Sequence, residues 1–228
     1  MRIAPDLGDA SIVLVGSFNP RIFRPDWFAR TGPVTEAEAG AANVEIIHPE
    51  ITLLRMDWLR IRVEPGRLIA TTEEAPFIRL ADLVVRTFRE FLGHTPIGML
   101  GINREVHFSV GDEETKDRIG NLLAPKEPWG EWGPQIAGGK YPEKHGGMRG
   151  LVMEQRELED RFRGHIQARV APSTKVKAGI YMHINDHYEA EAPDDVVGCD
   201  EVVSILERQF DVSIRRSEWI IDQIMALK

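Results

Sequence analysis

Apolar and polar residues alternate along much of the chain, and this alternation predicts β-strands. Apolar positions recur at every second residue, or in short apolar runs, over residues 11–18, 44–63, 68–72 and 97–110, and again near 151–155, 162–170 and 176–189. Such patterns are typical of strands with one buried face. Pro65-Gly66 interrupts one of these runs. The pair fits a type II turn and therefore predicts that the strands on either side of it are antiparallel neighbours.

Two other stretches have the three-and-four spacing of amphipathic helices. One is expected to begin at Pro76 and to end at Gly93, with the apolar positions Phe77, Leu80, Ala81, Val84, Phe88, Phe91 and Leu92. The other, compatible with one long helix or two consecutive ones, carries Val203, Leu206, Phe210, Ile214, Ser217, Ile221 and Ile224. Asp112 can cap a shorter helix between them.

These elements predict an α+β protein made of two related halves of antiparallel sheet, each covered by a substantial helix. Residues 1–111 form the N-terminal α+β half, 112–147 a helix and a connection rich in Pro, Gly and Trp, and 148–228 a β-meander followed by a helix. Residues 20–40 predict an irregular connection anchored on the core by Trp27 and Phe28. The long apolar seam near the C-terminus also predicts a homodimer.

Composition narrows the class of protein. The chain has 228 residues, of which 43% are hydrophobic and 28% charged, as in ordinary folded domains. Its 36 acidic and 28 basic residues give a net charge of −8, which argues against a dominant nonspecific grip on nucleic acid. A local basic patch at Arg55, Arg60, Arg62 and Arg67 stays open, the alternative being the solvated face of an ordinary strand.

Location follows from two further features of the sequence. No apolar run approaches the roughly 20 residues that cross a bilayer, so no membrane association is expected. Cys199 is the single cysteine. It cannot form an internal disulfide, which fits a reducing compartment and predicts a cytoplasmic protein.

The segment Gly16-Ser17-Phe18-Asn19-Pro20 resembles the start of the ATP-binding loop of adenylyltransferases. In those enzymes two histidines follow the turn and bind the ATP phosphates, whereas here Arg21-Ile22-Phe23 follows. Those enzymes also need a parallel sheet, and this sequence predicts hairpins. We therefore interpret the segment as a strand ended by an Asn-Pro turn.

The predicted strand at 176–189 carries one candidate ligand group. His183, Asn185 and His187 fall on one face together with Glu189, while Met182, Ile184 and Tyr188 fall on the other. The two histidines are about 13 Å apart by the strand rise, too far to share a metal. Asp186 could join one of them only if the segment bends. A polar face exposed to solvent is the alternative, and neither a metal nor a cofactor is expected.

A second candidate group lies at Asn103, Arg104 and His107, on the predicted strand at 97–110. Arg104 shares its face with Leu100, Ile102, Val106 and Phe108, so an ideal strand buries its charge. A buried guanidinium needs a carboxylate or several carbonyls. It is therefore a structural ion pair or a ligand anchor. The two groups form one groove only if their strands are neighbours and both groups share a face.

Other polar and aromatic residues do not complete a catalytic constellation, so no catalytic residues are expected. Trp129 and Trp132 lie in a glycine-bearing segment, where they either cover a core edge or contact a partner. Cys199 precedes the last helix with no histidine nearby in the sequence. It is interpreted as a small buried or capping residue.

Several segments together resemble a sporadically distributed family of uncharacterised bacterial proteins. They are SIVLVGSFNPRIFRPDWF, VEIIHPEITLLRMDWL with the following PGR, LADLVVRTFREF leading to TPIGMLGINREVHF, LAPKEPW and IYMHINDHYE. The resemblance implies a bacterial protein and no established activity.

The sequence thus favours a non-enzymatic interaction, accessory or sensor protein of a bacterial cytoplasmic complex, with an unknown protein partner. The alternative is a small-ligand-binding domain or an enzyme, with a groove lined by Asn103, Arg104, His107, His183 and His187. Asn185 belongs to the same candidate ligand set.

Overall fold

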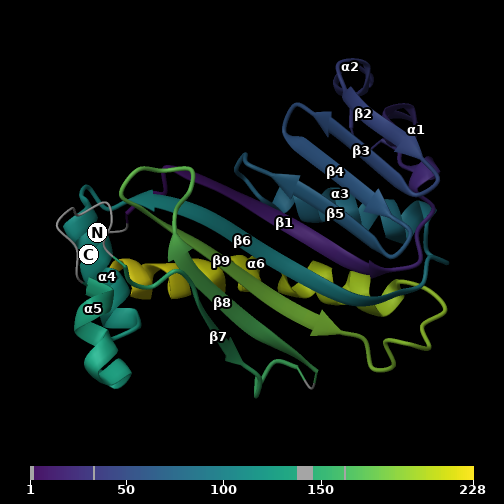
Figure 1. Cartoon of the computed structure of the whole chain (residues 1–228). Coiled ribbons are helices and arrows are strands. Elements are labelled where there is room, and N and C mark those ends of the chain that lie inside the picture. Colours follow the sequence, from purple (N-terminus) through teal and green to yellow (C-terminus); the bar gives the residue numbers. More distant parts are fainter. Residues whose placement is uncertain (1–2, 33, 138–145, 162) are drawn as a thin grey trace.

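The computed structural model describes residues 3–32, 34–137, 146–161 and 163–228 (Figure 1). One antiparallel sheet of nine strands, in the order β2-β3-β4-β5-β1-β6-β9-β8-β7, forms the body of the protein. Helices cover one of its faces, so the predicted α+β class with antiparallel sheet is confirmed. The sheet is continuous across the boundary expected at residue 111, because β6 pairs with β9 along its whole length.

The strands follow the alternation of the sequence, with two differences. Their bounds are β1 Leu7–Gly16, β2 Asn43–His48, β3 Ile51–Met56, β4 Leu59–Glu64, β5 Arg67–Thr72, β6 Ile97–Ser109, β7 Leu151–Gln155, β8 Gly164–Pro172 and β9 Gly179–Glu189. β1 begins four residues before the expected start at Ser11 and therefore includes Asp9. It pairs antiparallel with β5 and β6 in the middle of the sheet, not within a parallel sheet of the adenylyltransferase kind.

The second difference is a hairpin within residues 51–63, where the sequence predicted one long strand. The chain turns at Asp57-Trp58, and β3 pairs with β4 from Met56 and Leu59 outward. Trp58 is buried, and its indole N–H donates to Glu38 Oε1 at 3.0 Å. Pro65-Gly66 joins β4 and β5 as an antiparallel pair, as expected. Gly66 lacks the positive φ of a type II turn, so that detail was wrong.

Two helices supply most of the cover over the sheet. α3 (Ile78–Arg86), which continues as the π-helical turn η2 (Thr87–Phe91), packs against β5 and β1. α6 (Asp200–Met225) is one unbroken helix and lies across β6 and β9 (Figure 1). Its seam residues Leu206 and Phe210 are buried in the core. The seam therefore packs within the chain and gives no support to the homodimer, which stays a prediction.

Short helices lie at both ends of the sheet. α1 (Pro25–Thr31) and α2 (Glu36–Gly40) stand beside β2, where an irregular connection was expected, and Phe28 anchors them in the core. At the other end, Asp112 accepts a hydrogen bond from the N–H of Thr115 at 2.7 Å and caps α4 (Glu113–Leu123), as predicted. The 3₁₀ turns η1 (Pro20–Ile22) and η3 (Glu127–Trp132) and the helix α5 (Gly133–Ala137) complete the described elements.

Candidate functional site

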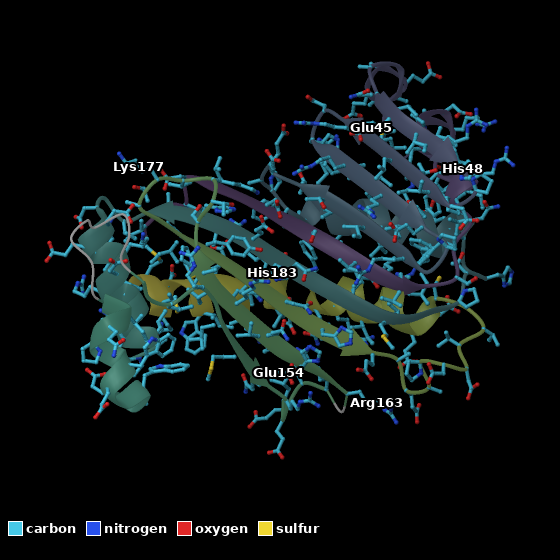
Figure 2. All side chains as sticks on the ribbon, in the orientation of Figure 1. Glu45, His48, Glu154, Arg163, Lys177 and His183 are labelled. Carbon is cyan, nitrogen blue, oxygen red and sulfur yellow. The ribbon has the colours of Figure 1, made fainter. Side chains whose placement is uncertain are left out.

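The face of the sheet that points away from α3 and α6, which we call the open face, carries most of its polar side chains. On β1, Ala10, Ile12 and Leu14 point toward the helices and are fully buried. Asp9 and Ser11 alternate with them and therefore lie on the open face. Figure 2 views the protein from this side, with His183 near the middle of the sheet.

Register aligns titratable and charged residues in one row across four strands of the open face. Asp9 on β1 is opposite Glu105 on β6, and Glu105 is opposite His183 on β9. His183 is in turn opposite Arg169 on β8. Residues directly opposite each other have Cβ atoms about 5 Å apart, so each pair in this row is in side-chain contact range.

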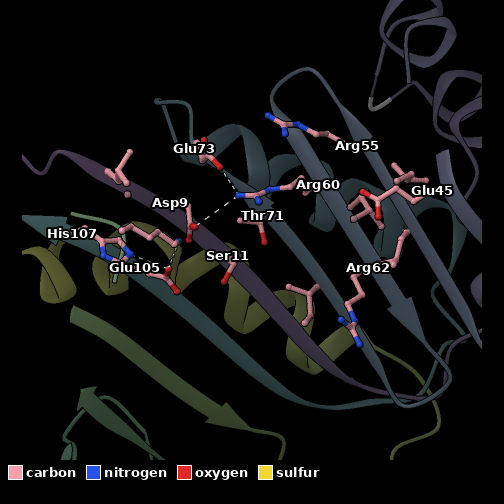
Figure 3. Close-up of a pocket in the computed structure, with 17 residues that line it drawn as sticks. Asp9, Ser11, Glu45, Arg55, Arg60, Arg62, Thr71, Glu73, Glu105 and His107 are labelled. Carbon is pink, nitrogen blue, oxygen red and sulfur yellow. Dashed lines mark hydrogen bonds and ion pairs between the residues drawn. The ribbon is translucent and has the colours of Figure 1, made fainter. Parts of the chain in front are cut away.

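A cavity of about 570 Å³ lies at the Asp9–Glu105 end of this row (Figure 3). It extends from β3 and β4 across β5 and β1 to β6. Glu105 and Lys175 line one end, Asp9 and Arg60 lie next to each other in the middle, and Arg62 lines the other end. This volume is within the range of small-molecule sites in proteins.

Glu105 is the anchored member of the acidic pair. Its carboxylate accepts hydrogen bonds from Lys175 Nζ at 3.2 Å and from the Tyr181 hydroxyl at 3.1 Å, and His107 Nε2 lies 3.5 Å away. Burial works to raise the pKa of Glu105, but the hydrogen bonds from Lys175 and Tyr181 outweigh it and lower that pKa. Glu105 is therefore an anion at neutral pH.

Asp9 is the less satisfied member. Arg60 Nη2 lies 4.0 Å from its carboxylate, and among the described residues no hydrogen bond to that carboxylate is formed. Burial, followed by the charge of Glu105, raises the pKa of Asp9 to about 6. Asp9 thus titrates near pH 6, at the wall of the cavity.

The loop after β8 fixes the positions of Lys175 and His107 next to Glu105. Ser173 Oγ accepts the N–H groups of Lys175 at 3.1 Å and Val176 at 2.9 Å. Its own hydrogen is then available for His107 Nδ1, 2.8 Å away. The His107 proton consequently resides on Nε2, facing Glu105. Burial lowers the pKa of His107, so the ring is neutral at pH 7.

The structure brings five of the six predicted ligand residues to the open face. Asn103 and Asn185 are directly opposite each other on the neighbouring strands β6 and β9. By strand alternation His107, His183 and His187 share this face. The adjacency that a common groove requires is therefore present, while ligand binding by these residues stays a prediction.

Arg104 is the exception, because its side chain lies on the helix-covered face. It is 6% exposed, and its Nε donates to Glu218 Oε1 on α6 at 2.9 Å. Its Nη1 donates to the carbonyl oxygens of Asp9 at 2.8 Å and Glu105 at 3.1 Å. A Cβ atom at Gly8 would lie 2.8 Å from this guanidinium, so glycine leaves it room. Arg104 is a structural ion pair and does not line the open-face groove.

Asp186 also differs from its expected role. It does not join a histidine, because it lies on the covered face, where it accepts hydrogen bonds from Arg161 and Arg216. His183 and His187 remain four residues apart along one strand face, with Asn185 between them. His187 instead stacks with His165 at 4.8 Å. Within the described ranges, no three His, Cys, Asp or Glu side chains are arranged to hold a metal ion.

The four arginines of the candidate basic patch do share the open face, on β3, β4 and β5. Arg60 pairs with Glu73 at 2.5 Å, and Arg62 Nε donates to Glu64 at 2.9 Å. The charges of the two central arginines are thereby balanced. This part of the face is an amphipathic strand surface with ion pairs.

Comparisons with models of protein families and with curated proteins found no match for this chain. Function must therefore be inferred from the geometry of the protein itself.

The remaining candidates lie away from the cavity. Trp129 and Trp132 are 58% and 56% exposed and pack edge-to-face on η3, with ring centroids 5.5 Å apart. They do not cover a core edge. Cys199 is buried at the start of α6, and burial raises its pKa to about 11. Such a thiol is a poor nucleophile at neutral pH, in line with the interpretation as a small buried residue.

Sequence reasoning missed Asp9, Glu105, Lys175 and Tyr181. Glu105 could have been found, because it alternates with Arg104 and Val106 and so shares the face of Asn103 and His107. Asp9 was excluded by the late expected start of its strand. The contacts of Lys175 and Tyr181 with Glu105 depend on register between distant segments, which has no local signal.

Proposed function

We propose that the protein is a non-enzymatic sensor or accessory protein that binds a small polar ligand on the open face of its sheet. The observation that carries this proposal is the Asp9–Glu105 pair at the wall of the 570 Å³ cavity. As expected from its sequence, we place it in the bacterial cytoplasm. No helix in the described part of the chain combines the length and apolarity needed to cross a bilayer.

The Asp9–Glu105 pair lowers the stability of the folded protein, and a ligand bound there would offset this cost. Like charges directly opposite each other on neighbouring strands destabilise a sheet. Burial adds to that cost, since it raises the pKa of Asp9 to about 6. Perturbed carboxyl groups that line a cavity are characteristic of functional sites. A ligand that donates hydrogen bonds to Asp9 would offset the cost.

The hydrogen-bonding groups in the cavity lining indicate the chemical class of the ligand. The Asp9 carboxylate has free acceptor capacity, so it suits an ammonium or hydroxyl group of the ligand. The hydroxyls of Ser11 and Thr71, which are opposite each other on β1 and β5, line the same cavity. A small amine or polyhydroxylated compound therefore fits better than an apolar one.

The proposal can be tested by titrating ¹⁵N-labelled protein with a panel of amines, amino acids and sugars. We expect a binder to shift the amide signals of Ser11, Thr71 and Glu105. Asp9→Asn should weaken its binding at least about tenfold, since a charge-assisted hydrogen bond is lost. Asp194→Asn, which removes the same charge from an exposed loop, should leave binding unchanged. Equal binding by Asp9→Asn, or no binder at all in the panel, would contradict the proposal.

A wider groove remains a second candidate, because Asn103 and Asn185 face each other next to the acidic pair. A ligand-binding domain or enzyme using these amides with His107, His183 and His187 would extend the site over β9. Asn103→Ala with Asn185→Ala should then weaken the same ligand. If affinity did not change, the site would end at Glu105.

A protein partner is supported by a separate observation, the two exposed tryptophans on η3. Aromatic residues with this exposure commonly anchor interfaces. Trp129→Ala with Trp132→Ala should abolish capture of a partner in a pull-down while leaving the ligand titration intact.

Light scattering would detect the predicted homodimer, and a monomer at high concentration would refute it.

We also propose that the two halves of the chain are related, as the sequence predicted. The element order supports this: β1 and β6 are each followed by short helices, three meander strands and a covering helix, with β2 as an extra strand. Profiles of homologous sequences in which the two halves fail to align would contradict it.

A further inference from the structure

A second cavity, of about 550 Å³, lies on the open face at the other side of Lys175. Strands β6, β8 and β9 and the loop after β8 line it. It shares Glu105, His107 and Lys175 with the first cavity, so the two adjoin. Its other charged lining residues are Arg149 and Arg169.

The charge of this cavity differs from that of the first. Arg149 and Arg169 are exposed, and neither has a carboxylate partner among the described residues. The acid in the lining, Glu105, is already bonded to Lys175 and Tyr181. Two guanidinium groups beside a cavity, with no carboxylate partner in the described part of the chain, create a local site for an anion in a chain with a net charge of −8.

The backbone that carries Arg169 and Lys175 is ordered. Arg169 lies in the middle of β8, opposite His183. Lys175 belongs to the loop that the Ser173 hydroxyl fixes through the N–H groups of Lys175 and Val176. Such preorganisation lowers the entropy that anion binding would cost.

We propose that this second cavity binds a phosphate group. The planar fork of arginine matches the oxygens of a phosphate bidentately, so Arg149 and Arg169 are the two groups expected to bind it, while Lys175 neutralises Glu105 beside them. Thr174, whose hydroxyl can donate a further hydrogen bond, also lines the cavity.

The two cavities together define a class of ligand, and this step rests on the proposed function. Asp9 and Arg169 are in one row and three strand spacings apart, which is about 14 Å. A phosphorylated small molecule with an amine or hydroxyl at its other end would place the donor at Asp9 and the phosphate at Arg149 and Arg169.

Calorimetric titration of the full chain with inorganic phosphate, at constant ionic strength, tests the anion site alone. We expect saturable binding to the wild-type protein and at least about a tenfold weakening in the double variant Arg149→Ala/Arg169→Ala, since two charge-assisted bonds are lost. The control Arg21→Ala/Arg215→Ala removes the same charge from two exposed arginines elsewhere and should bind like the wild type. Equal weakening in both double variants, or no saturable binding to the wild type, would overturn the proposal.

Further arms separate this inference from the proposed function. Asp9→Asn should leave phosphate affinity within about twofold, because it alters only the donor end of the site. The phosphate result therefore stands even if amine or sugar binding fails.

Acetate should bind more weakly than phosphate, and equal affinity would contradict a phosphate site. Tight binding of a single-stranded oligonucleotide, lost in the Arg149/Arg169 variant, would contradict the small-molecule class. Arg169→Lys, which keeps the charge but loses the fork, should give intermediate affinity.

Discussion

Two carboxylates of this sheet, Asp9 on β1 and Asp186 on β9, have opposite environments. Asp186 is fully buried and accepts hydrogen bonds from Arg161 at 2.5 Å, Arg216 at 2.9 Å and the Tyr188 hydroxyl at 3.3 Å. Asp9 lies on the open face, with one arginine at 4.0 Å. Both belong to the same sheet, and only β6 separates their strands.

The difference teaches which acidic group serves the fold and which is available for a ligand. The partners of Asp186 compensate its burial from within the chain, and the guanidinium of Arg161 also stacks on the Tyr188 ring at 3.6 Å. Asp9 faces a like charge and a cavity instead. Satisfied buried charges commonly maintain a structure, whereas unsatisfied ones beside a cavity indicate function.

The largest expected effect comes from Asp186→Asn. This change leaves Arg161 and Arg216 without their shared carboxylate, and breaking a buried ion pair costs about 3 kcal/mol or more in free energy of unfolding. Urea denaturation would measure the loss. Asp194→Asn serves as the exposed control, with an expected change below about 0.5 kcal/mol. If both variants were equally stable, Asp186 would not be structural.

A smaller loss is expected for Arg161→Met, which keeps much of the apolar packing on Tyr188. Asp186 would retain Arg216 and the Tyr188 hydroxyl, so we expect about 2 kcal/mol of destabilisation. The same denaturation experiment measures it. A loss larger than that of Asp186→Asn would reverse the order of importance within the cluster.

Asp9→Asn should act in the opposite direction and stabilise the protein. The pKa of Asp9 is about 6 when folded and near 3.8 when unfolded, so wild-type stability falls as pH rises between these values. With its partial exposure discounted, we expect a gain of about 1 kcal/mol at pH 8. Near pH 3 the carboxyl is protonated in both states, and the gain should vanish. A stability loss at pH 8 would contradict a strained Asp9.

The smallest expected effect is on the titration of Asp9 in the variant Glu105→Gln. Burial is the larger cause of the raised pKa of Asp9 and the charge of Glu105 the second. The midpoint, followed by the ¹³C shift of the carboxyl carbon, should fall below 6 but stay above 3.8. An unchanged midpoint would show that the two carboxylates are not coupled.

Much of the fold was predictable because local patterns determine it. The alternation on β6, including the burial of Arg104 among apolar residues, correctly indicated one face of a central strand. The hairpin at Asp57-Trp58 was missed because apolar residues continue through the turn, and the phase changes where Trp58 and Leu59 are both buried. Such a phase change is easily interpreted as one longer strand.

The candidate site was only partly predictable. Alternation correctly grouped His183, Asn185 and His187, but it could not tell that Glu105 would lie between Asp9 and His183. That row depends on pairing between strands far apart in the sequence. Register of this kind is set by packing of the whole sheet and has no signature in any one segment.

The position of α6 in the chain has a consequence for how the protein is made. Ribosomes synthesise this helix after all nine strands, yet it covers the inner faces of β6 and β9. During translation, apolar residues that are buried in the folded protein, such as Ile102 and Ile184, therefore stay exposed until α6 has been synthesised. Nascent chains in this interval expose apolar surface and are prone to aggregate until α6 has folded onto the sheet.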